Sequence, residues 1–281
     1  FQNYRVLKPV QWSKIMVNAQ AGLARYLSKY ENQSIECSQY ALMKLGIDRI
    51  HCHLKIDEYV ILCVPFQLGF KRSLFIASLS RQELNFFQQY INGTAGLSIG
   101  FSPNRKHAPI QFFIRCNLAA LGQMKGREDM VIFVVDYKTT PDDLVSLLGN
   151  FLDNHARLRD QYEDHGNSVI RMTSSAAKIL GYNMYATITE SNTPGKRIQI
   201  FNLSNKTIDH LEADVSTERP QGTEVTYQLF FAKYRISVAG IVNSAVRLPQ
   251  GIIRTISRLA FSPELVEIIN DYWYTIGQLS S

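Results

Sequence analysis

The side chains best suited to metal binding lie in one strand-like stretch, at His51, Cys52 and His53. Alternate residues of a strand share a face, so the two imidazoles would point the same way. A metal site needs further ligands, which would have to come from Cys37 or Cys63. Nothing in the sequence places either cysteine beside the two histidines. We therefore predict no metal site and no cofactor.

Two acidic groups are candidates for catalysis. Asp142 and Asp143 follow a proline at the expected start of a helix, where carboxylates are stabilised by the helix dipole. Asp209 and His210, near Glu212, are neighbours on a strand and so point to opposite faces. Glycine-rich phosphate loops, the GxSxG turn and the HExxH motif are missing. These observations predict no catalytic residues and a protein that is not an enzyme.

A polar motif lies in the stretch IFNLSNKTI at 200–208. It resembles the (D/N)xSxxG motif of the PilZ domain, a small β-barrel best known for binding cyclic di-GMP, with Thr207 in the place of the glycine. The resemblance covers residues 165–275 directly, and residues 40–152 only through an internal repeat. The chain looks most like the tandem PilZ-like proteins of spirochaetes. The resemblance implies ligand-binding roles for Asn202 and Ser204. The alternative is that both side chains only cap a hairpin turn.

The second PilZ motif, RxxxR, does not precede Asn202. Paired arginines bind phosphates through bidentate hydrogen bonds, so the chain needs another source of guanidinium groups. Arg171 and Arg197 are the candidates. We favour Arg171, because Arg197 is five residues from Asn202 and is expected on the opposite face of that strand. Arg254 and Arg258 have the RxxxR spacing, but they follow the expected barrel.

One phrase occurs twice, as KRSLFIASLS at 71–80 and as KRIQIFNLS at 196–204. Upstream of each, SQYALMKLG at 38–46 and TSSAAKILG at 173–181 share a polar start, a helix-like run and a final glycine. The same order of parts in both halves indicates a tandem repeat.

Strand-like stretches separated by turn signals fill most of each half, and each half ends in a helix that begins near a proline, Pro141 or Pro263. The predicted fold class is mainly β with flanking helices (α+β). It consists of two tandem small antiparallel β-barrels of PilZ-like type, each closed by a helix.

The predicted domains are an N-terminal PilZ-like domain at 1–152, a polar linker at 153–170 and a C-terminal PilZ-like domain at 171–281. The first domain includes a helix within 11–30 that packs on the barrel or on a partner. Its apolar face consists of Ile15, Ala19, Leu23, Tyr26 and Leu27.

The net charge of +6 lies entirely in the first half, where residues 1–152 hold 17 basic and 11 acidic side chains. An anionic partner requires these charges to converge, and dispersed charges only improve solubility. Whether they converge depends on the positions of six basic residues: Lys71, Arg72, Arg105, Lys106, Lys125 and Arg127. Aromatic residues are not interleaved with them, so we expect no nucleic-acid partner.

The cysteines form no CxxC pair, and no apolar run is long enough to span a bilayer. We therefore expect reduced thiols, a cytoplasmic protein and no transmembrane segment. The predicted function is a non-enzymatic signalling adaptor resembling PilZ proteins, with cyclic di-GMP as the ligand of the C-terminal barrel. The alternative is a degenerate PilZ scaffold that does not bind cyclic di-GMP and acts through a protein partner.

Overall fold

The structure is a computed structural model that describes residues 21–101, 110–164, 168–190, 193–213, 218–232 and 235–280. The chain divides into two units, Phe1–Asn154 and His155–Ser281, and each has a hydrophobic core of its own. In the described residues, no helix combines the length and the apolar character needed to span a bilayer.

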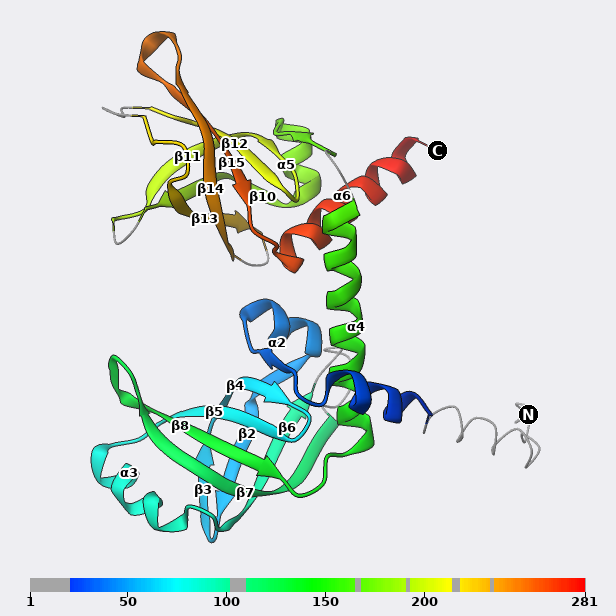
Figure 1. Cartoon of the computed structure of the whole chain (residues 1–281), viewed down its shortest axis with the longest axis vertical. Helices are drawn as coiled ribbons and strands as arrows, with labels where there is room; N and C mark the ends of the chain where they lie inside the picture. Colours follow the sequence, from blue (N-terminus) through cyan, green and yellow to red (C-terminus); the bar gives the residue numbers. More distant parts are fainter. Residues whose placement is uncertain are drawn as a thin grey trace, which may run out of the picture. The chain divides into compact units, whose positions relative to one another are not determined.

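The first unit is built on one eight-stranded antiparallel sheet with the order β1-β4-β5-β8-β7-β6-β2-β3 (Figure 1). Its strands are β1 (Ser34–Glu36), β2 (Ile47–Ile56), β3 (Tyr59–Leu62), β4 (Val64–Gly69), β5 (Arg72–Ser78), β6 (Thr94–Phe101), β7 (Ile110–Met124) and β8 (Arg127–Tyr137). The end strands β1 and β3 have only three and four residues and are not paired with each other. The barrel predicted for this half is therefore an open sheet in the described residues.

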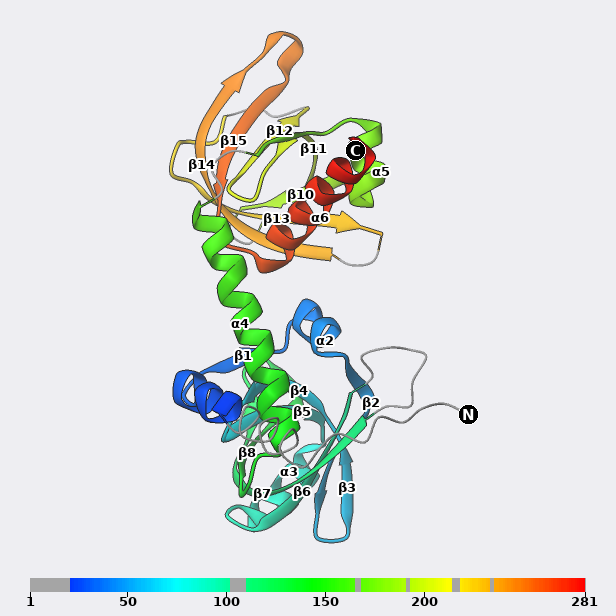
Figure 2. The same ribbon diagram turned by 90° about the vertical axis from the view of Figure 1, so that its right-hand side faces the viewer.

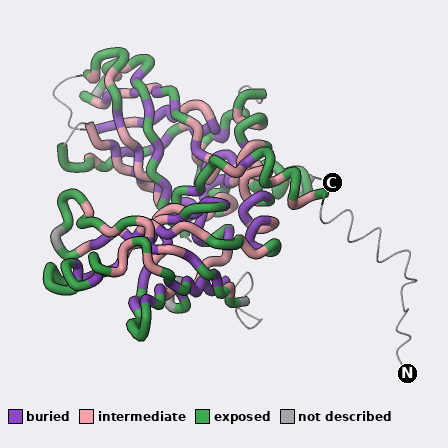
Figure 3. Tube along the Cα trace, turned by 60° about the horizontal axis from the view of Figure 1, so that its bottom comes forward, coloured by how far each residue is buried: buried purple, intermediate pink, exposed green. Residues whose placement is uncertain are grey.

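Alternation along the strands builds the core of the first unit. Leu54 and Phe133 are 0% exposed, whereas their chain neighbours on the other face are more exposed. Figure 3 shows buried and more exposed residues alternating along the strands. Because side chains of a strand alternate between the faces of a sheet, one face of each strand supplies the core. Cys52, Cys63 and Cys116 are buried in this core, and the four cysteines of the chain form no disulfide.

The first unit also contains helices. They are the helical residues 21–30, α2 (Gln39–Leu45), α3 (Arg81–Phe87), the 3₁₀ turn η1 (Gln88–Tyr90) and α4 (Asp142–Asp164), of which the first part belongs to this unit. In residues 21–30, Leu23 and Tyr26 pack against the core as predicted, but Leu27 is 37% exposed. Ile15 and Ala19 lie outside the described residues.

The second unit contains a closed antiparallel barrel of six strands, in the order β10-β13-β14-β15-β12-β11, which closes through the pairing of β10 with β11 (Figure 2). The short β9 adds to β11 outside the ring. The strands are β9 (Ile170–Arg171), β10 (Tyr182–Thr189), β11 (Lys196–Leu203), β12 (Thr207–Glu212), β13 (Glu224–Phe231), β14 (Arg235–Arg247) and β15 (Ile253–Leu259). The predicted barrel is confirmed for this half.

Two helices and a 3₁₀ turn complete the second unit: α5 (Ser174–Leu180), η2 (Pro249–Gly251) and α6 (Pro263–Ser280). α6 lies beside α5, and its Leu265 and Ile269 are buried in the core of the barrel unit (Figures 1 and 2). As predicted, α6 begins at Pro263 and α4 begins immediately after Pro141.

The two helices of the repeat are closely alike. α2 and α5 each have seven residues, with Ser38 and Thr173 as side-chain N-caps. Each ends at a glycine in the left-handed region, Gly46 with φ 69° and Gly181 with φ 65°, a conformation that costs glycine no steric clash. The repeat therefore predicted these two helices correctly.

The segment 153–170, predicted as a linker, is helical up to Asp164, because α4 continues through it. Residues 165–167 lie outside the described residues. The boundary between the two units falls inside this helix, at Asn154 and His155, so the domain limits proposed from the sequence stay a prediction.

Candidate functional site

The candidate site lies on the outer face of the barrel, where three strands carry a row of polar side chains. Arg171 on β9 pairs with Asn202 on β11, and Asn202 pairs in turn with Asp209 on β12. Residues directly opposite each other in an antiparallel ladder project on the same side of the sheet. The three side chains therefore form one row, which we call the outer polar row.

A β-bulge at Phe201 determines which side chains of β11 face outward. Ile200 pairs with His210 and Asn202 pairs with Asp209, so β11 has one residue more than β12 at this point. Such an extra residue interrupts the alternation of side chains. Phe201 and Asn202 are consequently both on the outer face, while Ile200 and Leu203 are buried in the core.

Asp209 organises the row. Its side chain is only 8% exposed. The carboxylate accepts two hydrogen bonds from Arg254 on β15, at 3.0 Å from Nε to Oδ1 and at 2.7 Å from Nη2 to Oδ2. The Asn202 amide donates a third bond to Oδ2, at 2.9 Å. A buried carboxylate requires such partners. In return, the carboxylate raises the pKa of Arg254, so that this guanidinium stays charged.

Two guanidinium groups on this face contact the same exposed aromatic ring. The Cζ atoms of Arg171 and Arg254 lie 5.6 and 5.4 Å from the centroid of the Phe201 ring, which is 36% exposed. Both distances are within the range of cation–π attraction. We call these three residues the arginine–phenylalanine cluster.

Ser204 is engaged in the turn that follows β11. The residue is 2% exposed, and its hydroxyl accepts hydrogen bonds from the backbone N–H groups of Lys206 and Thr207, at 3.2 and 2.9 Å. It also lies 2.8 Å from the Thr207 hydroxyl. The side chain therefore caps the β11–β12 turn, which is the alternative that the sequence left open for it.

Arg197 is on the outer face as well. Simple alternation predicted it on the opposite face from Asn202, but the extra residue of the bulge lies between them and places both side chains on the same face. Arg197 lies five residues away, about 17 Å along an extended strand. Its guanidinium packs over the Tyr185 ring, at 5.1 Å from the centroid. The structure thus brings Arg171, and not Arg197, next to Asn202.

Two residues of this face were missed by the sequence reasoning. Arg254 was set aside because it follows the expected barrel, yet β15 lies beside β12 and carries its guanidinium to Asp209. Phe201 carried no signal, because an aromatic residue in a strand usually indicates core. Together, the outer polar row and the arginine–phenylalanine cluster contain two guanidinium groups, one carboxylate, one amide and a flat ring, a combination suited to an anion that carries a planar group.

Inside the barrel, the other acidic candidates form a buried polar cluster. His210 Nε2 lies 3.0 Å from Glu212 Oε1, and the Arg219 guanidinium also donates to that oxygen. Tyr227 donates to Ser257 at 2.7 Å. His210 and Glu212 are both inward, whereas Asp209 faces outward, which separates Asp209 from His210 as predicted. Burial raises the pKa of the Tyr227 hydroxyl well above its ordinary value.

The metal candidates of the first unit are divided between different surroundings. His51 Nδ1 lies 2.8 Å from Asp48 Oδ2, while the neighbouring Cys52 is buried in the core. Cys63 is also buried, and burial raises the pKa of its thiol to about 12. In the described residues, no three histidine, cysteine or acidic side chains are grouped so that they could hold a metal ion.

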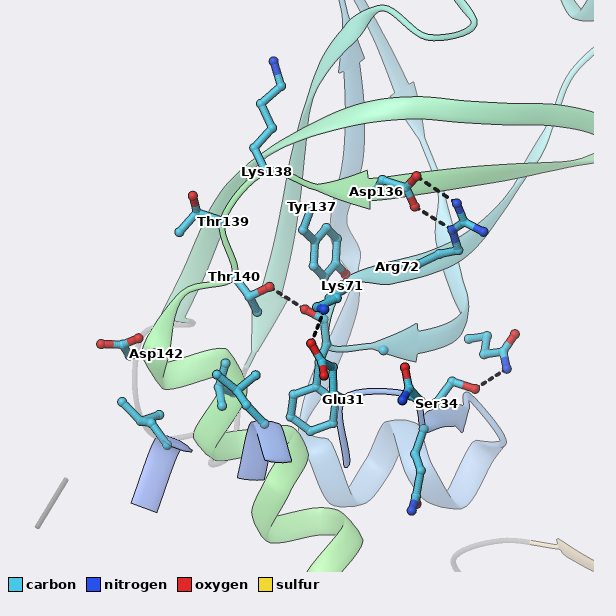
Figure 4. A pocket seen from close by; sticks show the side chains of 18 of the residues that line it. Glu31, Ser34, Lys71, Arg72, Asp136, Tyr137, Lys138, Thr139, Thr140 and Asp142 are labelled. Atoms are coloured by element: carbon cyan, nitrogen blue, oxygen red, sulfur yellow. Dashed lines mark hydrogen bonds and ion pairs between the residues drawn. The ribbon is translucent and has the colours of Figure 1, made fainter. Parts of the chain in front are cut away.

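The first unit has a pocket of about 820 Å³ beside the first copy of the repeated phrase (Figure 4). Lys71 forms an ion pair with Glu31, and Arg72 binds the Asp136 carboxylate through two hydrogen bonds of 2.5 and 2.8 Å. Lys138 points away from these pairs and donates to Thr94. The basic side chains that line the pocket are thus largely neutralised.

The other basic residues of this half do not join them. Arg127 pairs with Asp129 at 3.4 Å and begins β8, whereas Arg72 pairs in register with Asp136 near the end of the same strand. Nine residues of strand separate the two positions by roughly 30 Å. Lys125 precedes Arg127 in the β7–β8 turn, and Arg105 and Lys106 lie outside the described residues. The described basic residues are therefore dispersed.

Comparison of the sequence with known protein families gave a match in the first unit. Residues 21–155 match the PilZN3 domain. The match lies in the first unit, and it confirms the PilZ resemblance seen in the sequence. No curated protein sequence matches the chain.

The solved structures that match this chain share little sequence with it. The crystal structure of the Borreliella burgdorferi PlzA protein in complex with c-di-GMP is 14% identical with a TM-score of 0.48, covering 90% of this chain and 99% of that one. K. pneumonia MrkH in complex with c-di-GMP is 9% identical with a TM-score of 0.32, covering 88% and 98%. Escherichia coli YcgR in complex with c-di-GMP is 10% identical with a TM-score of 0.28, covering 94% and 92%.

Proposed function

We propose that the chain is a PilZ-type signalling adaptor, without a reaction of its own, whose second unit binds cyclic di-GMP on the outer face of the barrel. Two observations motivate the class: the PilZN3 match of the first unit and the Asn-x-Ser motif at 202–204. The observation that carries the site is the direct pairing of Arg171 with Asn202 across β9 and β11.

Arg171 has the properties of a phosphate ligand. It is exposed, and within the described part of the chain no carboxylate lies at ion-pair distance from it. Its guanidinium contacts the Phe201 ring, and because the residue is exposed a ligand can reach it. Guanidinium groups bind phosphate through paired hydrogen bonds, and the Asn202 amide oxygen adds an acceptor for a base N–H.

Calorimetric titration of the full chain with a panel of cyclic dinucleotides tests this proposal. We expect heat of binding with cyclic di-GMP and about tenfold or greater weakening in Arg171→Ala, because a charge-assisted hydrogen bond is lost. Arg197→Ala is the matched control, since it removes an exposed arginine of the same face far from Asn202. Equal affinity of Arg171→Ala and wild type would exclude the site.

A second candidate function is a PilZ scaffold that acts through a protein partner without cyclic di-GMP. The observation that favours it is the internal use of the motif side chains: the Ser204 hydroxyl caps the turn, and the Asn202 amide donates to Asp209. Absence of binding heat with every cyclic dinucleotide would select this candidate.

A further inference from the structure

We propose that Arg254, on the last strand of the barrel, supplies the second guanidinium group of the cyclic dinucleotide site and so replaces the arginine pair that does not precede Asn202. This inference rests on the proposed function. It goes beyond that function because it names a second arginine, so that the two guanidinium groups come from β9 and β15, the first and last strands of the second unit. The ligand class is a nucleotide with two phosphates, which matches two separate guanidinium groups.

The topology of the barrel brings the two arginines to one place. β9 flanks β11 on one side, and β12 followed by β15 flanks it on the other. Arg171 and Arg254 therefore approach Phe201 from opposite sides of β11. Each Cζ atom lies within 5.6 Å of the same ring centroid, so the two guanidinium carbons are at most about 11 Å apart, the sum of the two distances. A single small ligand can contact both.

Asp209 holds Arg254 in a fixed orientation but does not use all of its donors. The carboxylate binds Nε and Nη2. A guanidinium has five N–H donors, so Nη1 and one hydrogen of Nη2 are left for a ligand, and the side chain is 41% exposed. Because its position is set before a ligand arrives, little conformational freedom is lost on binding.

The charges and the ring select the kind of ligand. Arg171 and Arg254 carry two positive charges against the single carboxylate of Asp209, so this face attracts an anion. The exposed Phe201 ring, with guanidinium planes beside it, favours a planar group next to that anion, since bases stack on aromatic and guanidinium faces. A nucleotide satisfies both requirements, whereas inorganic phosphate satisfies only the first.

The test compares matched variants of the full chain by calorimetric titration with cyclic di-GMP. Arg254→Lys keeps the positive charge beside Asp209 but loses the planar fork, and Arg258→Lys is the control on the same strand and face. A second pair, Asp209→Asn against Asp209→Asn/Arg254→Ala, removes the guanidinium without leaving a buried carboxylate unpaired. Thermal unfolding of each variant verifies that it is folded.

We expect Arg254→Lys to bind about tenfold or more weakly than wild type, and the double variant to bind about tenfold or more weakly than Asp209→Asn. Arg258→Lys should bind within about twofold of wild type. Binding by wild type, weakened by Arg171→Ala but unchanged in both Arg254 comparisons, would overturn this inference and leave the proposed function standing. Absence of binding by wild type would overturn both.

Discussion

Removing the guanidinium of Arg219 should destabilise the second unit far more than the loss of an exposed ion pair. The Glu212 side chain is 0% exposed inside the barrel, where Oε1 accepts hydrogen bonds from Arg219 and from His210. Arg219→Ala leaves this buried carboxylate with the imidazole alone. Removing one partner of a buried ion pair costs about 3–5 kcal/mol. We expect about 3 kcal/mol, at the lower end, because His210 remains.

The pH dependence of that loss has a definite sign. Burial raises the pKa of Glu212, but the hydrogen bonds from His210 and Arg219 outweigh it and hold the pKa below its ordinary value. In the wild type, this contribution to stability is present above the unfolded pKa of about 4.3 and is lost as pH falls through the lower folded pKa. Without Arg219, the burial that raises the pKa of Glu212 is less opposed, so the deficit of the variant grows as pH rises through the unfolded pKa of about 4.3.

The assay is thermal unfolding of the full chain at several pH values, with Arg127→Ala as control. Arg127 lies 3.4 Å from Asp129 in a pair whose side chains are 61% and 65% exposed. Exposed pairs contribute about 0.5 kcal/mol or less, so the control should unfold nearly as the wild type does. A deficit of Arg219→Ala below about 1 kcal/mol at neutral pH, or one that does not change with pH, would refute the reasoning.

Three further predictions follow from individual contacts. Gly149→Ala places a methyl group 2.3 Å from Cγ of Tyr26, so residues 21–30 should loosen from α4 and exchange their amide hydrogens faster; unchanged exchange contradicts this. Gly240→Ala brings Cβ within 2.9 Å of the Tyr227 ring and should lower the stability by about 1–3 kcal/mol, measured by thermal unfolding. Burial raises the pKa of Cys63 to about 12, so alkylation at pH 8 should be slow in the folded chain and fast in urea; equal rates would refute it.

The helices could be predicted from the sequence because their signals are local. A hydroxyl N-cap, a proline in the first turn and a terminal glycine act within a few residues of the chain. The starts of α4 and α6 at Pro141 and Pro263, and the paired helices α2 and α5, follow from these signals alone.

Barrel closure and the composition of the site could not be predicted, because both depend on pairings between distant strands. Closure requires β10 to pair with β11 as well as with β13, and no local pattern specifies that. Arg254 reaches Asp209 only because β15 lies beside β12. The bulge at Phe201 also defeats simple alternation, since a period of two places Arg197 and Asn202 on opposite faces.

The extra residue in β11 allows the outer face to vary independently of the core. A chain without Phe201 would still pair Ile200 with His210 and Asn202 with Asp209, now as consecutive pairs of a regular ladder. Ile200 and Leu203 would still be directed inward and Asn202 outward. Substitution or deletion of Phe201 is therefore expected to alter the outer face while the core-facing side chains of the barrel stay in place.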